Sequence, residues 1–216
     1  MTAERFLIVN ADDLGMSAAV NAGIFAAHEH GIVTSASLMV LRDDAVAAVD
    51  ALSAHPALAV GLHLEWRSSF GGDMPDKGRT PAEECRAQLE RFRELVGRDP
   101  THLDSHKHVH EDEPVKGAAE ELAAELGVPL RNRSIRYEGG FYGRDAISPE
   151  HLMRLIGDLP PGWTEIGCHP AAGPVPTSSY DVERRIELAT LRHPEVKNLL
   201  NVTSVRLCSY AQVFAP

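Results

Sequence analysis

A segment of nine residues in the middle of the chain carries a histidine at almost every second position. Histidines stand at 102, 106, 108 and 110, and Asp104 occupies the remaining even position. Alternate side chains of an extended chain point to the same face, so this spacing predicts one face with four imidazoles and a carboxylate. Imidazoles and carboxylates grouped in this way are typical of metal sites. A solvent-exposed polar strand is the alternative interpretation.

Residues of the same kinds follow other short apolar runs. Asp12 and Asp13 come after the first run, and His63 and His169 stand at the ends of two later runs. Neighbouring strand residues point to opposite faces, so we expect Asp12 and Asp13 to have different roles. Asp13, His63 and one histidine of the nine-residue segment would supply two imidazoles and one carboxylate. Such a set leaves coordination positions of a metal ion open for water and substrate.

His169 lies between Cys168 and Pro170, and a proline biases the residue before it towards an extended conformation. A general acid is one interpretation of His169, and a strand-end histidine bonded to the backbone is the other. Cys168 should point to the opposite face, so we expect it to pack in the core rather than act as a nucleophile. A serine-hydrolase elbow is excluded, because the sequence contains no G-x-S-x-G motif.

The elements that must position these residues alternate along the chain. Apolar runs predict strands at 6–9, 35–41, 57–64, 102–105, 128–130, 164–168 and 205–209. Amphipathic stretches predict helices at 17–30, 43–54, 81–97, 111–126, 149–159 and 182–191. This alternation favours an α/β fold with a parallel sheet, whose strands share one carboxyl end where the polar residues meet. No G-x-G-x-x-G follows the first run, so a (β/α) barrel-like fold of about seven strands is favoured over an open doubly wound sheet.

The composition is that of a globular chain, with 216 residues of which 44% are hydrophobic and 24% charged. No linker or shift in composition divides the chain, so we expect one domain over residues 1–216. The stretches 67–80 and 137–146 lack periodicity and contain paired glycines and aromatic residues. Both are expected to form loops around the site.

The net charge of −10 at pH 7 excludes a nucleic-acid partner, since the densest arginine cluster, at 131, 133 and 136, is short. The three cysteines are far apart and form no C-x-x-C motif, which favours a reducing compartment. No apolar run approaches the 18 residues of a membrane span. We therefore expect a cytoplasmic protein with a small-molecule substrate, no membrane contact and a surface compatible with a homodimer.

Five motifs in order along the chain resemble the YdjC-like carbohydrate deacetylases, which include chitooligosaccharide and hopanoid-biosynthesis deacetylases. The motifs are LIVNADDLG at 7–15, GIVTS at 31–35, GLH at 61–63, PTHLDSHKHVH at 100–110 and CHP at 168–170. The resemblance runs from residue 5 to about residue 212. It implies a (β/α) barrel-like fold related to the polysaccharide deacetylases. It also implies a metal-dependent hydrolase that removes an N-acetyl group from an amino sugar.

The resemblance also implies a role for each matching residue. Asp13, His63 and His106 correspond to the metal ligands, Asp12 to the catalytic base and His169 to the acid. Two imidazoles favour Zn²⁺, Co²⁺ or Fe²⁺, whereas members of the family are often described with Mg²⁺. The segment after His63 is shorter than in many members, and it is expected to shape the sugar pocket.

Other classes of protein would use similar residues. A metal-dependent amidohydrolase or phosphoesterase on a barrel would need more ligands for a second ion, and His108 and His110 could supply them. A non-catalytic sugar- or metal-binding protein would keep the ligands but would not need Asp12 and His169 together. A structural scaffold would leave the histidine face unexplained.

Overall fold

The computed structural model describes residues 4–66 and 78–213. Its seven strands pair only in parallel, in the order β4-β3-β2-β1-β6-β5, and β7 pairs with β1. The strands are β1 (Arg5–Leu14), β2 (Ser35–Leu38), β3 (Ala59–Leu64), β4 (Leu103–Ser105), β5 (Arg136–Glu138), β6 (Gly162–Cys168) and β7 (Val205–Cys208). The α-helices are α1 (Ala18–His30), α2 (Ala45–Ala51), α3 (Pro81–Val96), α4 (Val115–Leu126), α5 (Pro149–Gly157), α6 (Asp181–Leu191) and α7 (Pro194–Val202).

The long strand β1 is the centre of the sheet and has three partners. Arg5 pairs with both Gly162 of β6 and Val205 of β7, so these two strands lie on opposite edges of β1. Further along, Asn10 pairs with Ser35 of β2. Strands β7 and β2 therefore occupy the same edge of β1, one after the other.

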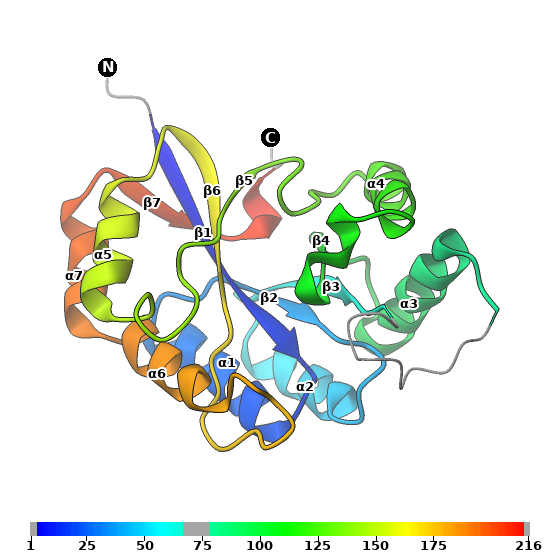
Figure 1. Cartoon of the computed structure of the whole chain (residues 1–216), viewed down its shortest axis with the longest axis horizontal. Helices are drawn as coiled ribbons and strands as arrows, with labels where there is room; N and C mark the ends of the chain where they lie inside the picture. The colour runs from blue at the N-terminus through cyan, green and yellow to red at the C-terminus, as the bar shows by residue number, and fades with distance from the viewer. Residues whose placement is uncertain (1–3, 67–77, 214–216) are drawn as a thin grey trace.

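Two isolated bridges connect the region between β4 and β5. Leu103 of β4 pairs with Leu130, and Arg131 pairs with Ile135, which directly precedes β5. Irregular backbone thus joins the two ends of the curved sheet, and the helices cover its outside (Figure 1). The predicted (β/α) barrel-like fold of about seven strands is confirmed.

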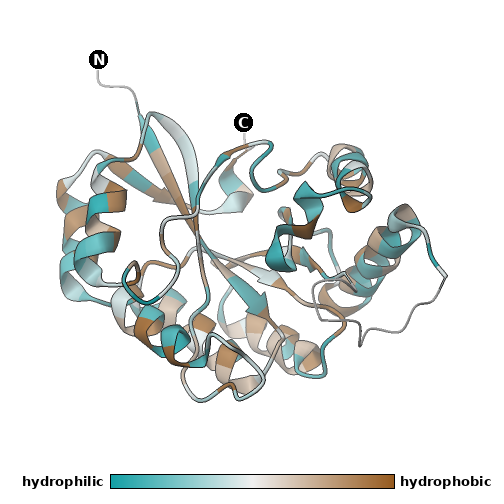
Figure 2. Ribbon diagram, in the orientation of Figure 1, coloured by the Kyte–Doolittle hydropathy of each residue, from teal (hydrophilic) through white to brown (hydrophobic). Residues whose placement is uncertain are grey.

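The side chains of β1 divide between two environments according to their parity. Leu7 and Val9 belong to the large core between the sheet and the helices, whereas Ile8 lies in a small separate apolar cluster. That cluster also contains Ala59, Ile135 and Tyr210. Asn10 and Asp12 have the parity of Ile8, so the interior changes from apolar to polar towards the carboxyl end of the strand. In Figure 2, β1 is brown along its middle and teal towards its carboxyl end.

Two predicted elements differ from the structure. The strand predicted at 128–130 is wrong, because Pro129 has no N–H to continue a ladder and only Leu130 forms an isolated bridge. The true strand, β5, begins at Arg136 and overlaps the start of the predicted loop 137–146. Its three residues are too few to produce a periodic pattern. Helix α7 was also not predicted from the sequence.

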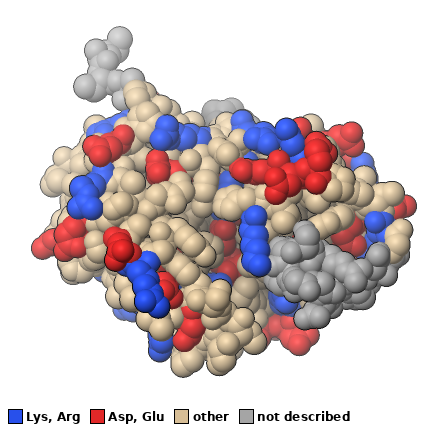
Figure 3. Space-filling view, viewed as in Figure 1, with Lys and Arg blue, Asp and Glu red and all other residues tan. Residues whose placement is uncertain are grey.

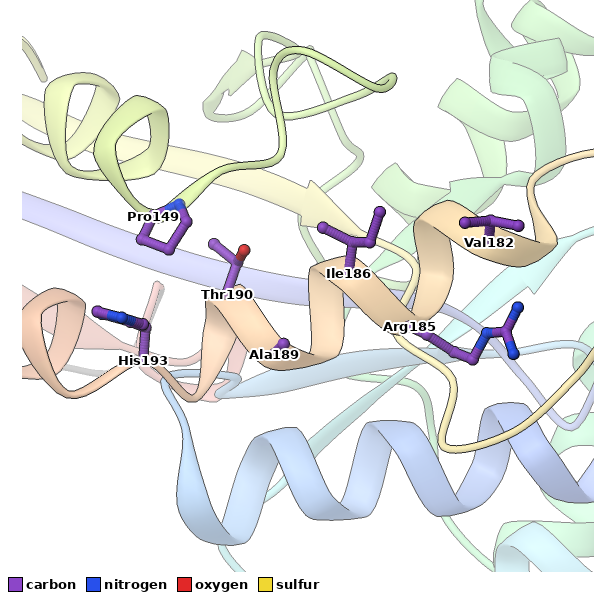
Figure 4. Close-up of a pocket in the computed structure, with 7 residues that line it drawn as sticks. All are labelled: Pro149, Val182, Arg185, Ile186, Ala189, Thr190 and His193. Carbon is purple, nitrogen blue, oxygen red and sulfur yellow. The ribbon is translucent and has the colours of Figure 1, made fainter.

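The first turns of helix α6 bury charged residues and expose two apolar ones. Arg184 and Glu187 face the interior, whereas the side chains of Val182 and Ile186 are 55% and 42% exposed. The outer face of α6 and the start of α5 line a pocket of about 430 Å³ (Figure 4). This pocket lies on the opposite side of α6 from the polar carboxyl ends of the strands.

None of the helices in the described ranges is long and apolar enough to cross a membrane. Acidic and basic side chains are interspersed over the visible face of the molecule, which shows no extended basic stripe (Figure 3).

Candidate active site

The predicted site residues meet at one end of the sheet. Asp12 and Asp13 lie at the end of β1, His63 near the end of β3, His106 directly after β4, and His169 directly after β6. Of the predicted loops around this end, residues 67–77 lie outside the described part of the chain.

Asp13, His63 and His106 form a compact group, with one ligand atom from each residue lying within 4.8 Å of the others. The Oδ1 atom of Asp13 is 3.1 Å from Nδ1 of His106 and 3.5 Å from Nε2 of His63. The other carboxylate oxygen accepts a 2.6 Å hydrogen bond from Arg184 on α6. Burial disfavours the Asp13 carboxylate, but these partners outweigh burial and hold the pKa of Asp13 well below its usual value.

The backbone at Asp13 explains how both adjacent aspartates reach this end of the sheet. Asp13 has φ = 69°, the left-handed region, which aspartate tolerates better than most side chains. Its carbonyl accepts a 3.0 Å hydrogen bond from Met16, and the β1–β2 register shifts between Ala11 and Leu14. The strict alternation of β1 therefore ends before Asp13.

The surroundings of His63 fit a bound divalent cation. Its Nε2 atom is buried and makes no hydrogen bond, although it lies beside Asp13. Its Nδ1 atom is 2.8 Å from Asp104 and 3.2 Å from the hydroxyl of Ser37. Metal-ligating histidines typically donate one ring N–H to a carboxylate, which leaves the other ring nitrogen available to the metal. Burial disfavours the charged imidazole, but Asp104 outweighs burial and raises the pKa of His63 well above its ordinary value.

Asp12 is held by a fully buried arginine that sequence reasoning did not assign to the site. Arg131 donates to both oxygens of Asp12, at 2.7 and 2.6 Å. The same guanidinium contacts Asp104 at 2.8 Å and Glu165 at 2.6 Å. Burial raises the pKa of Asp12, but the positive charge of Arg131 outweighs burial and lowers it below the usual value. Asp12 is therefore ionised at neutral pH.

Tyr210, in the 3-10 helix Tyr210–Gln212 near the end of the described chain, supports the Arg131 network. The hydroxyl of Tyr210 donates a 2.5 Å hydrogen bond to Glu165, and its ring stacks on His102 with centroids 3.8 Å apart. Burial lowers the pKa of His102 to about 4, so this histidine is neutral. His102 therefore belongs to the packed interior and lies apart from the Asp13 group.

His169 lies between the ionised Asp12 and a buried glutamate of α6. Its Nε2 atom is 3.9 Å from Asp12, and its Nδ1 atom is 3.9 Å from Glu187. Glu187 accepts hydrogen bonds from the backbone N–H of His169 and from the hydroxyl of Tyr180. Burial lowers the pKa of His169 to about 4 and raises the pKa of Glu187 to about 8. At neutral pH the proton of this pair therefore resides on Glu187.

The prediction that residues 102–110 present one extended face is wrong beyond Ser105. A 3-10 turn follows at His106–Glu111, with left-handed φ values of 54° at Lys107 and 55° at His108. The turn separates His106, which joins Asp13, from His108 and His110. Those two histidines and Glu111 form a second group of potential ligands within 4.8 Å of one another.

Arg131 could have been found from the sequence by one signal. Glu165 stands inside an apolar run that predicts a buried strand, and a buried carboxylate requires a buried cation. No comparable signal marks Glu187, because Val182 and Ile186 of α6 face outwards.

A family model described as YdjC-like protein matches residues 6–202 of the chain. A carbohydrate deacetylase of Geobacillus stearothermophilus is 35% identical, over 97% of this chain and 98% of the relative. A chitooligosaccharide deacetylase of Yersinia pestis is 31% identical, over 96% of this chain and 98% of the relative. The resemblance inferred from the five motifs is thereby confirmed.

Solved structures share the fold of this chain. A structure from Enterococcus faecalis superimposes with a TM-score of 0.84 and 28% identity, over 98% of this chain and 99% of the other. A peptidoglycan deacetylase of Bacillus subtilis superimposes with a TM-score of 0.58 and 13% identity, over 97% and 90%, which shows a likeness of fold. With the family model matching most of its length and relatives above 30% identity over nearly all of it, this chain belongs to the YdjC-like protein family.

Proposed function

We propose that the chain is a metal-dependent deacetylase that removes an N-acetyl group from an amino sugar or oligosaccharide and releases acetate. The observation that carries this proposal is the meeting of Asp13, His63 and His106 with Asp12 and His169 at one end of the sheet. The deacetylase names of the relatives support the same chemistry.

Asp13, His63 and His106 would hold the metal ion. A divalent cation at these residues polarises an acetyl carbonyl and makes a water molecule more acidic. Two imidazoles with one carboxylate suit Zn²⁺ or Co²⁺ better than Mg²⁺, which prefers oxygen ligands.

Asp12 would act as the general base. Arg131 keeps its carboxylate ionised and fixes its orientation. Oδ1 also accepts a hydrogen bond from Asn10, whereas Oδ2 accepts only from Arg131 among the described residues and retains a further lone pair. Asp12 can therefore accept the proton of the attacking water molecule. A positioned base of this kind contributes about 10²–10⁴-fold to the rate.

His169 would deliver a proton to the departing amine. Its imidazole is neutral in the free protein, because burial lowers its pKa to about 4. Burial raises the pKa of Glu187 to about 8, and its Oε1 atom is 3.9 Å from Nδ1 of the ring. We propose that Glu187 supplies a proton as His169 releases its own to the leaving nitrogen.

Acetate release tests the proposal directly. The chain is incubated with a panel of N-acetylated mono- and oligosaccharides, with Zn²⁺, Co²⁺ or Mg²⁺ added to metal-free protein. Asp12→Asn is expected to retain metal and lose about 10²–10⁴-fold in kcat. Val202→Ala, on the exposed outer surface of α7, is the matched control and should behave as the wild type. Turnover within tenfold of the wild type in Asp12→Asn would remove Asp12 from the mechanism.

A second candidate function is a two-metal phosphoesterase or amidohydrolase. The group of His108, His110 and Glu111 favours it, because three potential ligand atoms lie within 4.8 Å of one another. A metal content of two ions per chain, with hydrolysis of phosphate esters and no acetate release, would select it.

We also propose a cytoplasmic location. All three cysteines are free and buried, which is typical of a reducing compartment.

A further inference from the structure

An exposed aromatic ring lies beside the proposed catalytic histidine. Tyr142, in the connection between β5 and α5, is 57% exposed. Other large hydrophobic side chains are also exposed among the described residues, but all of them are aliphatic. They are Leu41, Val46, Val182, Ile186, Val202 and Leu207. Exposure of a large aromatic ring next to a catalytic group is typical of a ligand-binding surface.

Another aromatic ring covers one face of the Tyr142 ring. Tyr180 stacks on it with centroids 4.4 Å apart and planes only 2° from parallel. His169 meets the ring edge-on, at 5.6 Å and 73°. These two ring contacts leave the opposite flat face of Tyr142 outside the stack, which agrees with the 57% exposure of this residue.

The stack is fixed in place before any ligand binds. The hydroxyl of Tyr180 donates a 2.8 Å hydrogen bond to the buried Glu187 and accepts a 2.9 Å hydrogen bond from the backbone N–H of Gly143. Gly143 directly follows Tyr142, so the connection before α5 is tied to α6, as the two lie in Figure 1. A ring that is already immobilised loses little conformational entropy when a ligand stacks on it.

We propose that the free face of Tyr142 binds a pyranose ring of the substrate, whose N-acetyl nitrogen lies at His169. This inference rests on the proposed deacetylase function and adds a sugar-binding residue to it. A pyranose ring carries C–H groups on one face, and a flat aromatic surface covers them, whereas its hydroxyl groups remain at the rim in water. An aliphatic side chain would bury similar area but would lack the flat face.

Binding is measured by isothermal titration calorimetry with a trimer of N-acetylglucosamine, in the Asp12→Asn background so that the ligand is not consumed. Tyr142→Ala and Tyr142→Leu are expected to weaken binding five- to tenfold, which corresponds to about 1–1.4 kcal/mol. Tyr142→Phe keeps the flat face and should stay within twofold, as should the distant control Val202→Ala. Thermal unfolding of each variant checks that the fold is retained, which the exposure of Tyr142 leads us to expect.

Steady-state kinetics supply a second readout. The ratio of kcat/KM for the trimer to kcat/KM for N-acetylethanolamine, which has no ring, should fall five- to tenfold in Tyr142→Ala and be restored in Tyr142→Phe. Unchanged affinity in Tyr142→Ala, or full affinity in Tyr142→Leu, would overturn the proposal that Tyr142 binds the sugar ring. If the wild type still released acetate, the proposed deacetylase function would stand. A wild type that neither binds the trimer nor releases acetate would overturn both proposals.

Discussion

Replacing Glu187 by glutamine should stabilise the protein at neutral pH. The carboxyl group is fully buried on α6, and burial raises its pKa from an ordinary value of 4.5 to about 8. Between these values the folded protein keeps the proton that the unfolded chain releases, so folding stability falls as the pH rises from about 4.5 to about 8. A glutamine side chain is neutral throughout, and its amide can still bond the backbone of His169 and the hydroxyl of Tyr180.

The size of the effect follows from the two pKa values. At pH 7 the unfolded side chain is about 2.5 units above its pKa, whereas the folded one is still protonated. At 1.36 kcal/mol per unit, this difference is roughly 3 kcal/mol of lost stability that Glu187→Gln would restore. At pH 5 the same arithmetic gives less than about 1 kcal/mol. For a chain of this length, 3 kcal/mol corresponds to a rise in Tm of roughly 6–12 °C.

Thermal and urea unfolding of metal-free protein at pH 5 and pH 7 measure this difference. Glu183→Gln is the matched control, because Glu183 lies one turn earlier on α6 and pairs with the exposed Arg144. Loss of that pair should change stability by at most about 1 kcal/mol. Equal stability of Glu187→Gln and the wild type at pH 7, or a gain that does not grow between pH 5 and pH 7, would refute the reasoning.

Three further predictions concern the site. Arg131→Met removes the guanidinium that contacts three buried carboxylates, so urea unfolding should show a free energy of unfolding lower by about 3–5 kcal/mol. A variant as stable as the wild type would contradict the stabilising role of Arg131. Wild-type kcat should fall above about pH 8, as Glu187 loses its proton, and this limb should be absent from the pH profile of Glu187→Gln. In a thermal-shift assay, Zn²⁺ at 100 times its Kd should stabilise the wild type by about 2.7 kcal/mol and should not stabilise His63→Ala. An equal shift in both proteins would show that the ion binds at another site.

The strand ends could be predicted from the sequence because a strand buried on both faces is a continuous apolar run, and the first polar residues after it mark its end. The run that became β1 is continuous, and the polar residues after it, Asp12 and Asp13, mark the carboxyl end of the strand. The shared carboxyl edge of parallel strands then placed His63 and Asp13 at the same end of the sheet. The parity rule for residues 102–110 failed at Lys107 and His108, because nothing in the residue types signals two successive left-handed residues there.

The supporting residues of the site were harder to predict. Arg131 lies in an irregular segment that bridges two strands, and its partners come from β1, β4 and β6, so its burial depends on contacts between distant parts of the chain. Glu187 could not be predicted, because the usual assumption that apolar helix residues face the core would place Val182 and Ile186 inside and Glu187 outside. In the structure Val182 and Ile186 are exposed and Glu187 is buried. Here the interior at the strand ends is polar, and the helix presents its charged side to it.

The three partners of β1 have a consequence for how the chain is made. Strand β1 comes first in the sequence, but its first half is completed by Val205–Cys208, about 200 positions later. Contacts between such distant positions are slow to form, because a long loop must close before they are made. At roughly 5–20 residues per second, a ribosome needs about 10–40 s to deliver β7 after β1. During that interval an apolar strand with an unpaired edge is available to chaperones and to neighbouring nascent chains.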